Sequence, residues 1–186
     1  MTASFAPPAI AQAQDLVPTL QAQGYAVVAA DMVSHLCAAP LAAFDAWLPT
    51  WADLPADGYL RDGGRYRRRR HACFVVQGDH ATLAPHRPHW QPLEYNALHG
   101  GMERHFEPML SAMVADPHWA QLLVWLGDVC SALRGAQTWY AEAHQFRIDT
   151  TDGIGRPTPE GAHRDGVDLV AVFLVAREHV KGGETR

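Results

Sequence analysis

One short triplet in the C-terminal part of the sequence has the residue types of a metal site. His163 and Asp165 lie two positions apart and are followed by Gly166, which allows a sharp local backbone geometry. On a β-strand, side chains two positions apart point to the same face, so this imidazole and carboxylate can reach one ion. They are two of the three ligands of a 2-His-1-carboxylate iron site. We therefore predict that His163 and Asp165 are metal ligands and catalytic residues.

The triplet alone carries little information, because a chain of 186 residues with 11 His and 13 Asp is expected to contain His-x-Asp about once by chance. Its context is more specific. A loop rich in Gly and Pro precedes it, at residues 153–161. Residues 167–175 follow as an apolar run, which is typical of a buried strand.

A run of arginines opens a second predicted strand, over residues 65–77. Residues 65–70 read Arg-Tyr-Arg-Arg-Arg-Arg, so alternation places Arg67 and Arg69 on one face and Arg68 and Arg70 on the other. A nucleic-acid surface is disfavoured by the net charge of −5. Two interpretations stay open: a solvated strand edge, or an arginine that pairs bidentately with a substrate carboxylate.

The pair His86-x-x-His89 resembles a metal motif in its spacing. No Cys or acidic residue accompanies it at ligand spacing, and Pro85, Pro88 and Pro92 surround it. We interpret both histidines as residues of a proline-rich loop.

Composition limits the class of protein. A chain of 186 residues with 48% hydrophobic residues is expected to form a single domain, residues 1–186, with a substantial core. No apolar run reaches membrane-spanning length and no secretory signal is visible. Three scattered cysteines indicate free thiols in a reducing cytoplasm. The sequence does not set the oligomeric state, and a homodimer stays an open option.

The periodicity of the sequence predicts an α+β fold without the βαβ alternation of nucleotide-binding sheets. Asp116-Pro117 is the clearest helix start, since Asp is a good N-cap and Pro fits the first helical position. The helices are expected over residues 9–23, 41–48, 102–114 and 116–133, and further strands over residues 25–30 and 137–148.

Several blocks together resemble one bacterial family, the 2-oxoglutarate/Fe(II) dioxygenases that include the free L-isoleucine hydroxylases and relatives described as biofilm and stress proteins. The resemblance runs from about residue 25 to the end of the sequence. The most specific block is residues 157–166, Pro-Thr-Pro-Glu-Gly-Ala-His-Arg-Asp-Gly. The other matching residues are 65–70, Gln91-Pro92, Asn96, Gly100-Gly101, Arg104, residues 106–108 and residues 144–148.

The resemblance implies a double-stranded β-helix, a jelly-roll or cupin-like core with N-terminal and inserted helices. It implies Fe(II) held by His163, Asp165 and a distal His, with 2-oxoglutarate as co-substrate and a free aliphatic L-amino acid as substrate. We assign Arg68 and Arg147 to carboxylate binding in the cofactor site. Two alternatives stay open: a catalytically silent relative that binds a small ligand or acts in stress or biofilm regulation, and a jelly-roll metalloprotein with other chemistry.

The end of the sequence departs from the family pattern. The distal His should follow Asp165 by several tens of residues, with a basic residue for 2-oxoglutarate after it, whereas His179 follows too soon. From this we expect that the C-terminal strands of the jelly roll lie beyond Arg186.

Overall fold

The structure is a computed structural model that describes residues 7–60, 65–94, 100–151, 153–156 and 165–181. It divides into two compact units, which are described separately below. Unit 1 contains Met1–Ala46, Val75–Thr82 and Ala115–Tyr140, and unit 2 contains Trp47–Phe74, Leu83–Val114 and Ala141–Arg186. Strands β1 and β3 each have residues in both units, so the prediction of a single domain over residues 1–186 stays a prediction.

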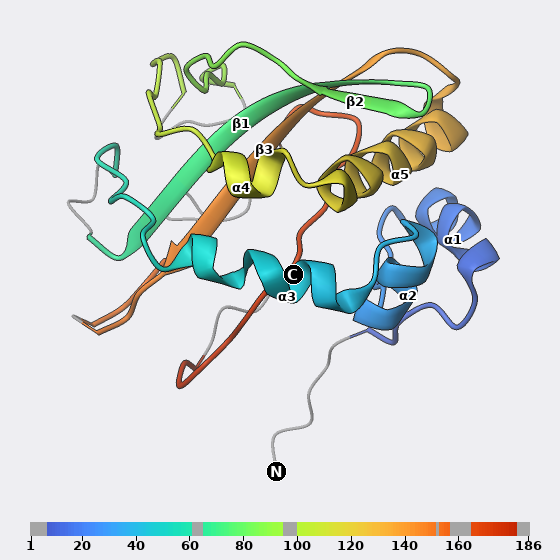
Figure 1. The fold of residues 1–186 in the computed structure, drawn as a ribbon, viewed down its shortest axis with the longest axis horizontal. Coiled ribbons are helices and arrows are strands. Elements are labelled where there is room, and N and C mark those ends of the chain that lie inside the picture. Colours follow the sequence, from blue (N-terminus) through green and yellow to red (C-terminus); the bar gives the residue numbers. More distant parts are fainter. Residues whose placement is uncertain (1–6, 61–64, 95–99, 152, 157–164, 182–186) are drawn as a thin grey trace. The chain divides into compact units, whose positions relative to one another are not determined.

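The described strands form one sheet in the order β2-β1-β3, with β1 (Arg67–Gln77) between β2 (His80–Leu83) and β3 (Trp139–Ile148) (Figure 1). Gly78, at φ 57°, lies in the tight turn that joins β1 to β2, where a left-handed backbone favours glycine. Later residues of β3 contact earlier residues of β1, as in the 2.7 Å bond from the Asp149 amide to the Tyr66 carbonyl. The sheet is therefore antiparallel.

Unit 1 contains most of the helical residues: η1 (Ala13–Asp15), α1 (Leu16–Gln23), α2 (Ala30–Leu36), most of α3 (Leu41–Trp47) and α5 (Pro117–Arg134). Asp116 caps α5 by accepting the His118 amide at 2.9 Å, and Pro117 occupies the first helical position. Helix α1 ends at Gly24, whose φ of 80° is the left-handed C-cap conformation that glycine adopts without strain.

The apolar face of α5 packs against the end of β1 inside unit 1. Gly127 makes this approach possible, because a Cβ built on it would lie 2.8 Å from Cγ1 of Val76. Leu122, Leu123 and Val129 are buried on the same helix. The predicted amphipathic helix over residues 116–133 is therefore confirmed, with its apolar side facing the core.

Unit 2 contains η2 (Leu48–Trp51), α4 (Ser111–Val114) and the sheet residues that line the site described below. A buried polar link fixes β3 to η2. The Gln145 amide donates to the Thr50 hydroxyl at 2.7 Å, and that hydroxyl donates to the Trp47 carbonyl at 2.6 Å. Gln145 is only 1% exposed; its NH₂ group has this partner, whereas its Oε1 has no hydrogen-bond partner among the described residues.

The predicted strands over residues 65–77 and 137–148 are confirmed as β1 and β3. The strand predicted over residues 25–30 is wrong: no strand is assigned there, and α2 begins at Ala30. The helix predicted over residues 102–114 is also wrong except for α4. Pro108 cannot continue a helix, and the backbone of this segment instead forms isolated bridges, Arg104 with His89 and Pro108 with His71.

Residues 167–175 do not form the buried strand that their composition predicts. The structure assigns no strand to them, and Val172 and Leu174 are 85% and 77% exposed. A strand is stable only when a neighbour satisfies its backbone groups, and the described sheet has no fourth member. The fold is mixed helix and antiparallel sheet, and the double-stranded β-helix stays a prediction.

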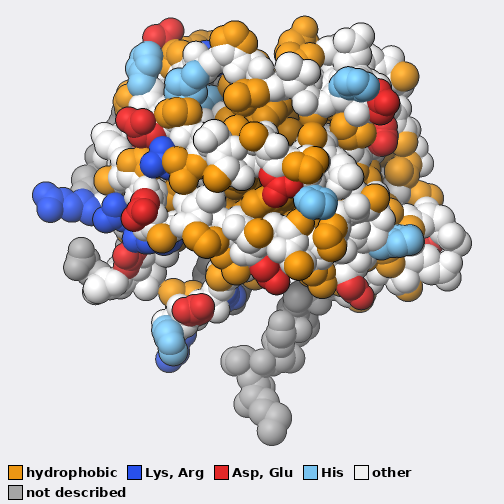
Figure 2. All heavy atoms as spheres, viewed as in Figure 1, with side chains coloured by type: hydrophobic (Ala, Val, Ile, Leu, Met, Phe, Trp, Pro, Cys, Tyr) orange, Lys and Arg blue, Asp and Glu red, His pale blue; other side chains and the backbone are white. Residues whose placement is uncertain are grey.

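No helix in the part of the chain that the structure describes has the length and apolarity needed to cross a bilayer. On the face drawn in Figure 2, few Lys and Arg side chains lie among many hydrophobic and uncharged ones.

Candidate functional site

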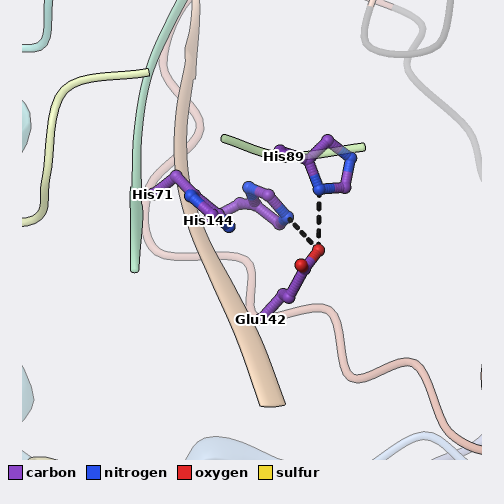
Figure 3. Close-up of side chains that lie close together, drawn as sticks. All are labelled: His71, His89, Glu142 and His144. Carbon is purple, nitrogen blue, oxygen red and sulfur yellow. Dashed lines mark hydrogen bonds and ion pairs between the residues drawn. The ribbon is translucent and has the colours of Figure 1, made fainter. Parts of the chain in front are cut away.

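Four side chains with metal-ligand chemistry point toward one another in unit 2: His71, His89, Glu142 and His144 (Figure 3). One nitrogen or oxygen of each lies within 4.8 Å of those of the other three. We call this group the histidine cluster. Imidazole and carboxylate are ligand types that Fe(II), Zn(II) and similar ions accept.

Strand alternation explains how the cluster assembles. His71 follows Arg67 and Arg69 on one face of β1, and Glu142 and His144 occupy the facing side of β3. His89 comes from the segment after β2. Its backbone is paired in both directions with Arg104, with two N–H···O bonds of 3.0 Å, so the ring is held in place.

The three rings of the cluster are packed closely. The rings of His71 and His144 stack with centroids 4.8 Å apart and an interplanar angle of 23°. The ring of His89 meets that of His144 edge-on, at 4.8 Å and 81°. His71 has no exposed surface, and its Nδ1 atom has no hydrogen-bond partner.

Hydrogen bonds fix the tautomer of His144. The guanidinium of Arg69 can only donate, and its Nη2 lies 2.7 Å from Nδ1 of His144, which must therefore accept. Neutral His144 then carries its proton on Nε2, and this nitrogen faces Oε2 of Glu142 at 4.0 Å. The same carboxylate oxygen lies 2.7 Å from Nδ1 of His89.

Burial sets the protonation of the cluster. It lowers the pKa of His71 to about 4, with like-charged neighbours adding to the effect. Burial, followed by the charge of Arg69, holds the pKa of His144 well below its usual value. Burial opposes ionisation of Glu142, but the hydrogen bond from His89 and the charges of His89, His71 and Arg87 together outweigh it, so the pKa of Glu142 is lowered. At neutral pH His71 and His144 are therefore neutral and Glu142 is ionised.

A buried cation stands directly behind the cluster. The guanidinium carbon of Arg69 lies 3.8 Å from the ring centroid of Phe106 and 4.5 Å from that of Phe146, a cation–π arrangement. Burial lowers the pKa of Arg69 to about 9, so it stays protonated at neutral pH. Arg67, also buried, is paired with Asp57 at 2.8 Å. The solvated-edge interpretation of this arginine run is therefore wrong.

The donor types of the cluster fit an iron ion, but Arg69 opposes metal binding there in two ways. Arg69 occupies Nδ1 of His144, so Nε2 of that ring carries a proton and offers no lone pair to a metal. The positive charge of Arg69 also disfavours a cation nearby. His71, His89 and Glu142 remain as donors. Figure 3 shows Glu142 linked to two of the histidines, to His89 by a hydrogen bond and to His144 by a 4.0 Å contact.

The predicted ligand Asp165 lies in the same unit. Its Oδ1 accepts a 3.3 Å hydrogen bond from Nε2 of Gln91, two residues after His89. The orientation of Gln91 is fixed in turn, because its Oε1 accepts from Arg104 at 2.7 Å. Metal-ligating carboxylates are usually held by such outer partners. His163, the other predicted ligand, lies outside the described residues.

The structure does not bring Arg68 and Arg147 to the histidine cluster. Arg68 donates to the carbonyl of Leu54 at 3.3 Å, and Arg147 donates to those of Trp51 and Ala52 at 3.3 and 3.0 Å. Alternation places both on the sheet face opposite the cluster. Their assignment to the cofactor stays a prediction, and Arg69 is the arginine of this run that contacts the cluster.

Sequence reasoning did not identify this cluster. The structure separates the two histidines of His86-x-x-His89: His86 pairs with the carbonyl of Phe106 at 2.9 Å, whereas His89 joins the cluster. Its acidic partner, Glu142, is 53 residues away in sequence. The one available signal was alternation, which puts Glu142 and His144 on one face of a predicted strand.

The sequence matches a known protein family over most of its length. The family model described as "2OG-Fe dioxygenase" matches residues 48–186, which include the whole cluster and both predicted ligands. No curated protein matches significantly.

The chain is similar to a bsmA homolog from Methylobium petroleophilum PM1 whose crystal structure is known. The two sequences are 48% identical and the structures match with a TM-score of 0.78, over 88% of this chain and 65% of the homolog. The chain therefore spans less than two thirds of the length of that relative.

Proposed function

This chain belongs to the 2OG-Fe dioxygenase family, and on that premise we propose that it hydroxylates a free aliphatic L-amino acid. Fe(II) and 2-oxoglutarate, the cofactors of this family, would supply the oxidising chemistry, with 2-oxoglutarate converted to succinate and CO₂. The observation that carries the proposal is the family match over residues 48–186, a range that contains His163, Asp165 and the histidine cluster.

We assign iron binding to His163 and Asp165. Asp165 is half-buried, and Gln91 holds its side chain, as expected for a ligand whose orientation matters. The histidine cluster lies at the other end of the short extended segment that contains Gln91. In this proposal the cluster shapes and polarises the pocket, because Arg69 already uses the Nδ1 lone pair of His144.

The jelly-roll core and the role of Arg68 and Arg147 in binding 2-oxoglutarate belong to the same proposal. Both guanidiniums are held by backbone carbonyls, which use only part of their donor capacity. A cytoplasmic location is supported by Cys37, Cys73 and Cys130, all of which are free thiols.

The experiment is succinate release in the presence of Fe(II), ascorbate, 2-oxoglutarate and a panel of free L-amino acids. We expect aliphatic members such as L-isoleucine to stimulate it. His163→Ala and Asp165→Ala should abolish succinate release without loss of the folded far-UV circular dichroism spectrum. His80→Ala is the matched control, because this histidine is 78% exposed and lies on β2.

Two results would contradict the proposal. Unchanged succinate release by His163→Ala would remove the ligand assignment, and the histidine cluster would then be the first place to look for iron. Absence of stimulation by every aliphatic amino acid in the panel would remove the substrate class while leaving family membership intact.

A further inference from the structure

An open groove lies in unit 2 beside Glu142. Its volume is about 450 Å³, and it is lined by Arg87, Pro88, Trp90, Glu103 and Glu142. The lining thus contains one cation, two carboxylates and an apolar wall. The carboxylate of Glu142 is shared with the histidine cluster, so the groove and the cluster are adjacent.

The charges of the groove are fixed before any ligand arrives. Nη2 of Arg87 lies 3.3 Å from Oε1 of Glu142, and the second carboxylate oxygen is 2.7 Å from Nδ1 of His89. Nε of Arg87 donates to the sulfur of buried Cys73 at 3.3 Å. Arg87 and Glu142 are therefore each anchored by a contact to a buried residue, while their side chains remain 58% and 30% exposed. This is a preorganised ion pair with an accessible side.

An apolar surface adjoins the ion pair. Trp90 is 54% exposed although tryptophan is among the residues most stabilised by burial, and Pro88 lies beside it in the same groove. An exposed aromatic ring next to paired charges is typical of a small-molecule site, where an apolar wall binds the body of the ligand and a few polar groups orient it.

The chain segment that lines the groove also contacts the proposed iron ligand. Trp90 is followed directly by Gln91, whose side-chain amide donates to Asp165. His89, between Arg87 and Gln91, contacts Glu142. One short segment therefore has contacts to the ion pair, to the cluster and to the proposed metal carboxylate.

We propose that this groove binds the zwitterionic head of the free amino-acid substrate. Arg87 takes the α-carboxylate, Glu142 with Glu103 takes the α-ammonium, and Trp90 with Pro88 contacts the aliphatic side chain. The zwitterion then lies antiparallel to the Arg87–Glu142 pair, so that each of its charges meets an opposite charge. The arginine fork matches a carboxylate bidentately, which a lysine would not. This inference rests on the proposed function, because that function supplies the amino-acid substrate.

The test is anaerobic titration calorimetry on the enzyme with Fe(II) and 2-oxoglutarate. Three probes are compared: L-isoleucine, L-isoleucinamide, which lacks the carboxylate, and N-acetyl-L-isoleucine, which lacks the ammonium. Wild type should bind L-isoleucine about tenfold more tightly than either analogue, the lower end of what one charge-assisted hydrogen-bond pair contributes. The low end applies because Arg87 is largely solvated.

The variants separate the two ends of the ligand. Arg87→Gln should lose the preference for L-isoleucine over the amide but keep the preference over the N-acetyl compound, and Glu142→Gln should do the reverse. Gln at position 142 can still accept from His89, which preserves the local fold. Arg156→Gln and Glu107→Gln are matched controls on exposed side chains outside the groove, and both should keep the wild-type ratios.

The outcomes distinguish this inference from the proposed function. Wild-type ratios in Arg87→Gln and Glu142→Gln, or no discrimination by wild type, overturn the groove assignment even if L-isoleucine stimulates succinate release. The expected ratios without any stimulated succinate release support the groove and count against hydroxylation.

Discussion

His71 should make the protein less stable in mild acid. The unfolded chain binds a proton on this residue near pH 6.5, whereas burial lowers its folded pKa to about 4. Between these values the unfolded state binds more protons, so the free energy of unfolding decreases as the pH falls. Replacing His71 with Gln, which does not titrate, should remove this contribution.

The size of the effect follows from the pKa difference. With 1.36 kcal/mol per pKa unit, the protonation of His71 should lower the free energy of unfolding by about 2.5 kcal/mol between pH 7 and pH 4.5. Above pH 6.5 the contribution vanishes, because the imidazole is neutral in both states. Other groups of the cluster, including Glu142, titrate in both proteins, so the difference between the wild-type and variant profiles reports His71 together with its effect on those groups.

The assay is urea unfolding followed by tryptophan fluorescence at several pH values from 7 to 4.5. His71→Gln should show a shallower decline in stability than wild type, whatever its stability at pH 7. His80→Gln, on a side chain that is 78% exposed, should decline in parallel with wild type. Parallel profiles for wild type and His71→Gln would refute the claim that this ring is buried in its neutral form.

Two further predictions concern the scaffold and the proposed iron site. Gly127→Ala should lower the free energy of unfolding by about 1–3 kcal/mol, because the new methyl group would overlap Val76. This loss should exceed the gain from the better helix propensity of Ala. A thermal unfolding midpoint at or above that of wild type would contradict the packing of α5 on β1. Gln91→Leu removes a hydrogen-bond donor to Asp165 and should weaken Fe(II) binding about 10- to 100-fold. Metal titration under anaerobic conditions measures the affinity. An unchanged affinity would argue against Asp165 as a metal ligand.

The elements with strong local signals were predictable. Alternation identified β1 and β3, and the Asp116-Pro117 cap with a regular apolar face identified α5. Residues 102–110 were predicted as helix because their composition permits it, but their backbone pairs with segments distant in sequence. Such pairing has no signal in the local sequence, and in this segment the tertiary contacts override the helix propensity of the residues.

The site was predictable only where its residues are close in sequence. The spacing of His163 and Asp165 is a local signal, and so is the shared strand face of Glu142 and His144. The contact of His89 with Glu142 depends on two chain segments being brought together by the sheet, and no periodicity reports it. Buried Arg69 illustrates the same limit, since an arginine run in isolation is more typical of a solvated surface.

The unequal environments of the three cysteines have a practical consequence for chemical labelling. Burial raises the thiol pKa of Cys73 and of Cys37, so both hold little of the reactive thiolate at neutral pH. Cys130, on α5 in unit 1, is less buried than either. A maleimide dye should therefore attach first to Cys130 and leave the histidine cluster intact. The slower modification of Cys73 would then report how often the side chain of Arg87 leaves its contact with the sulfur.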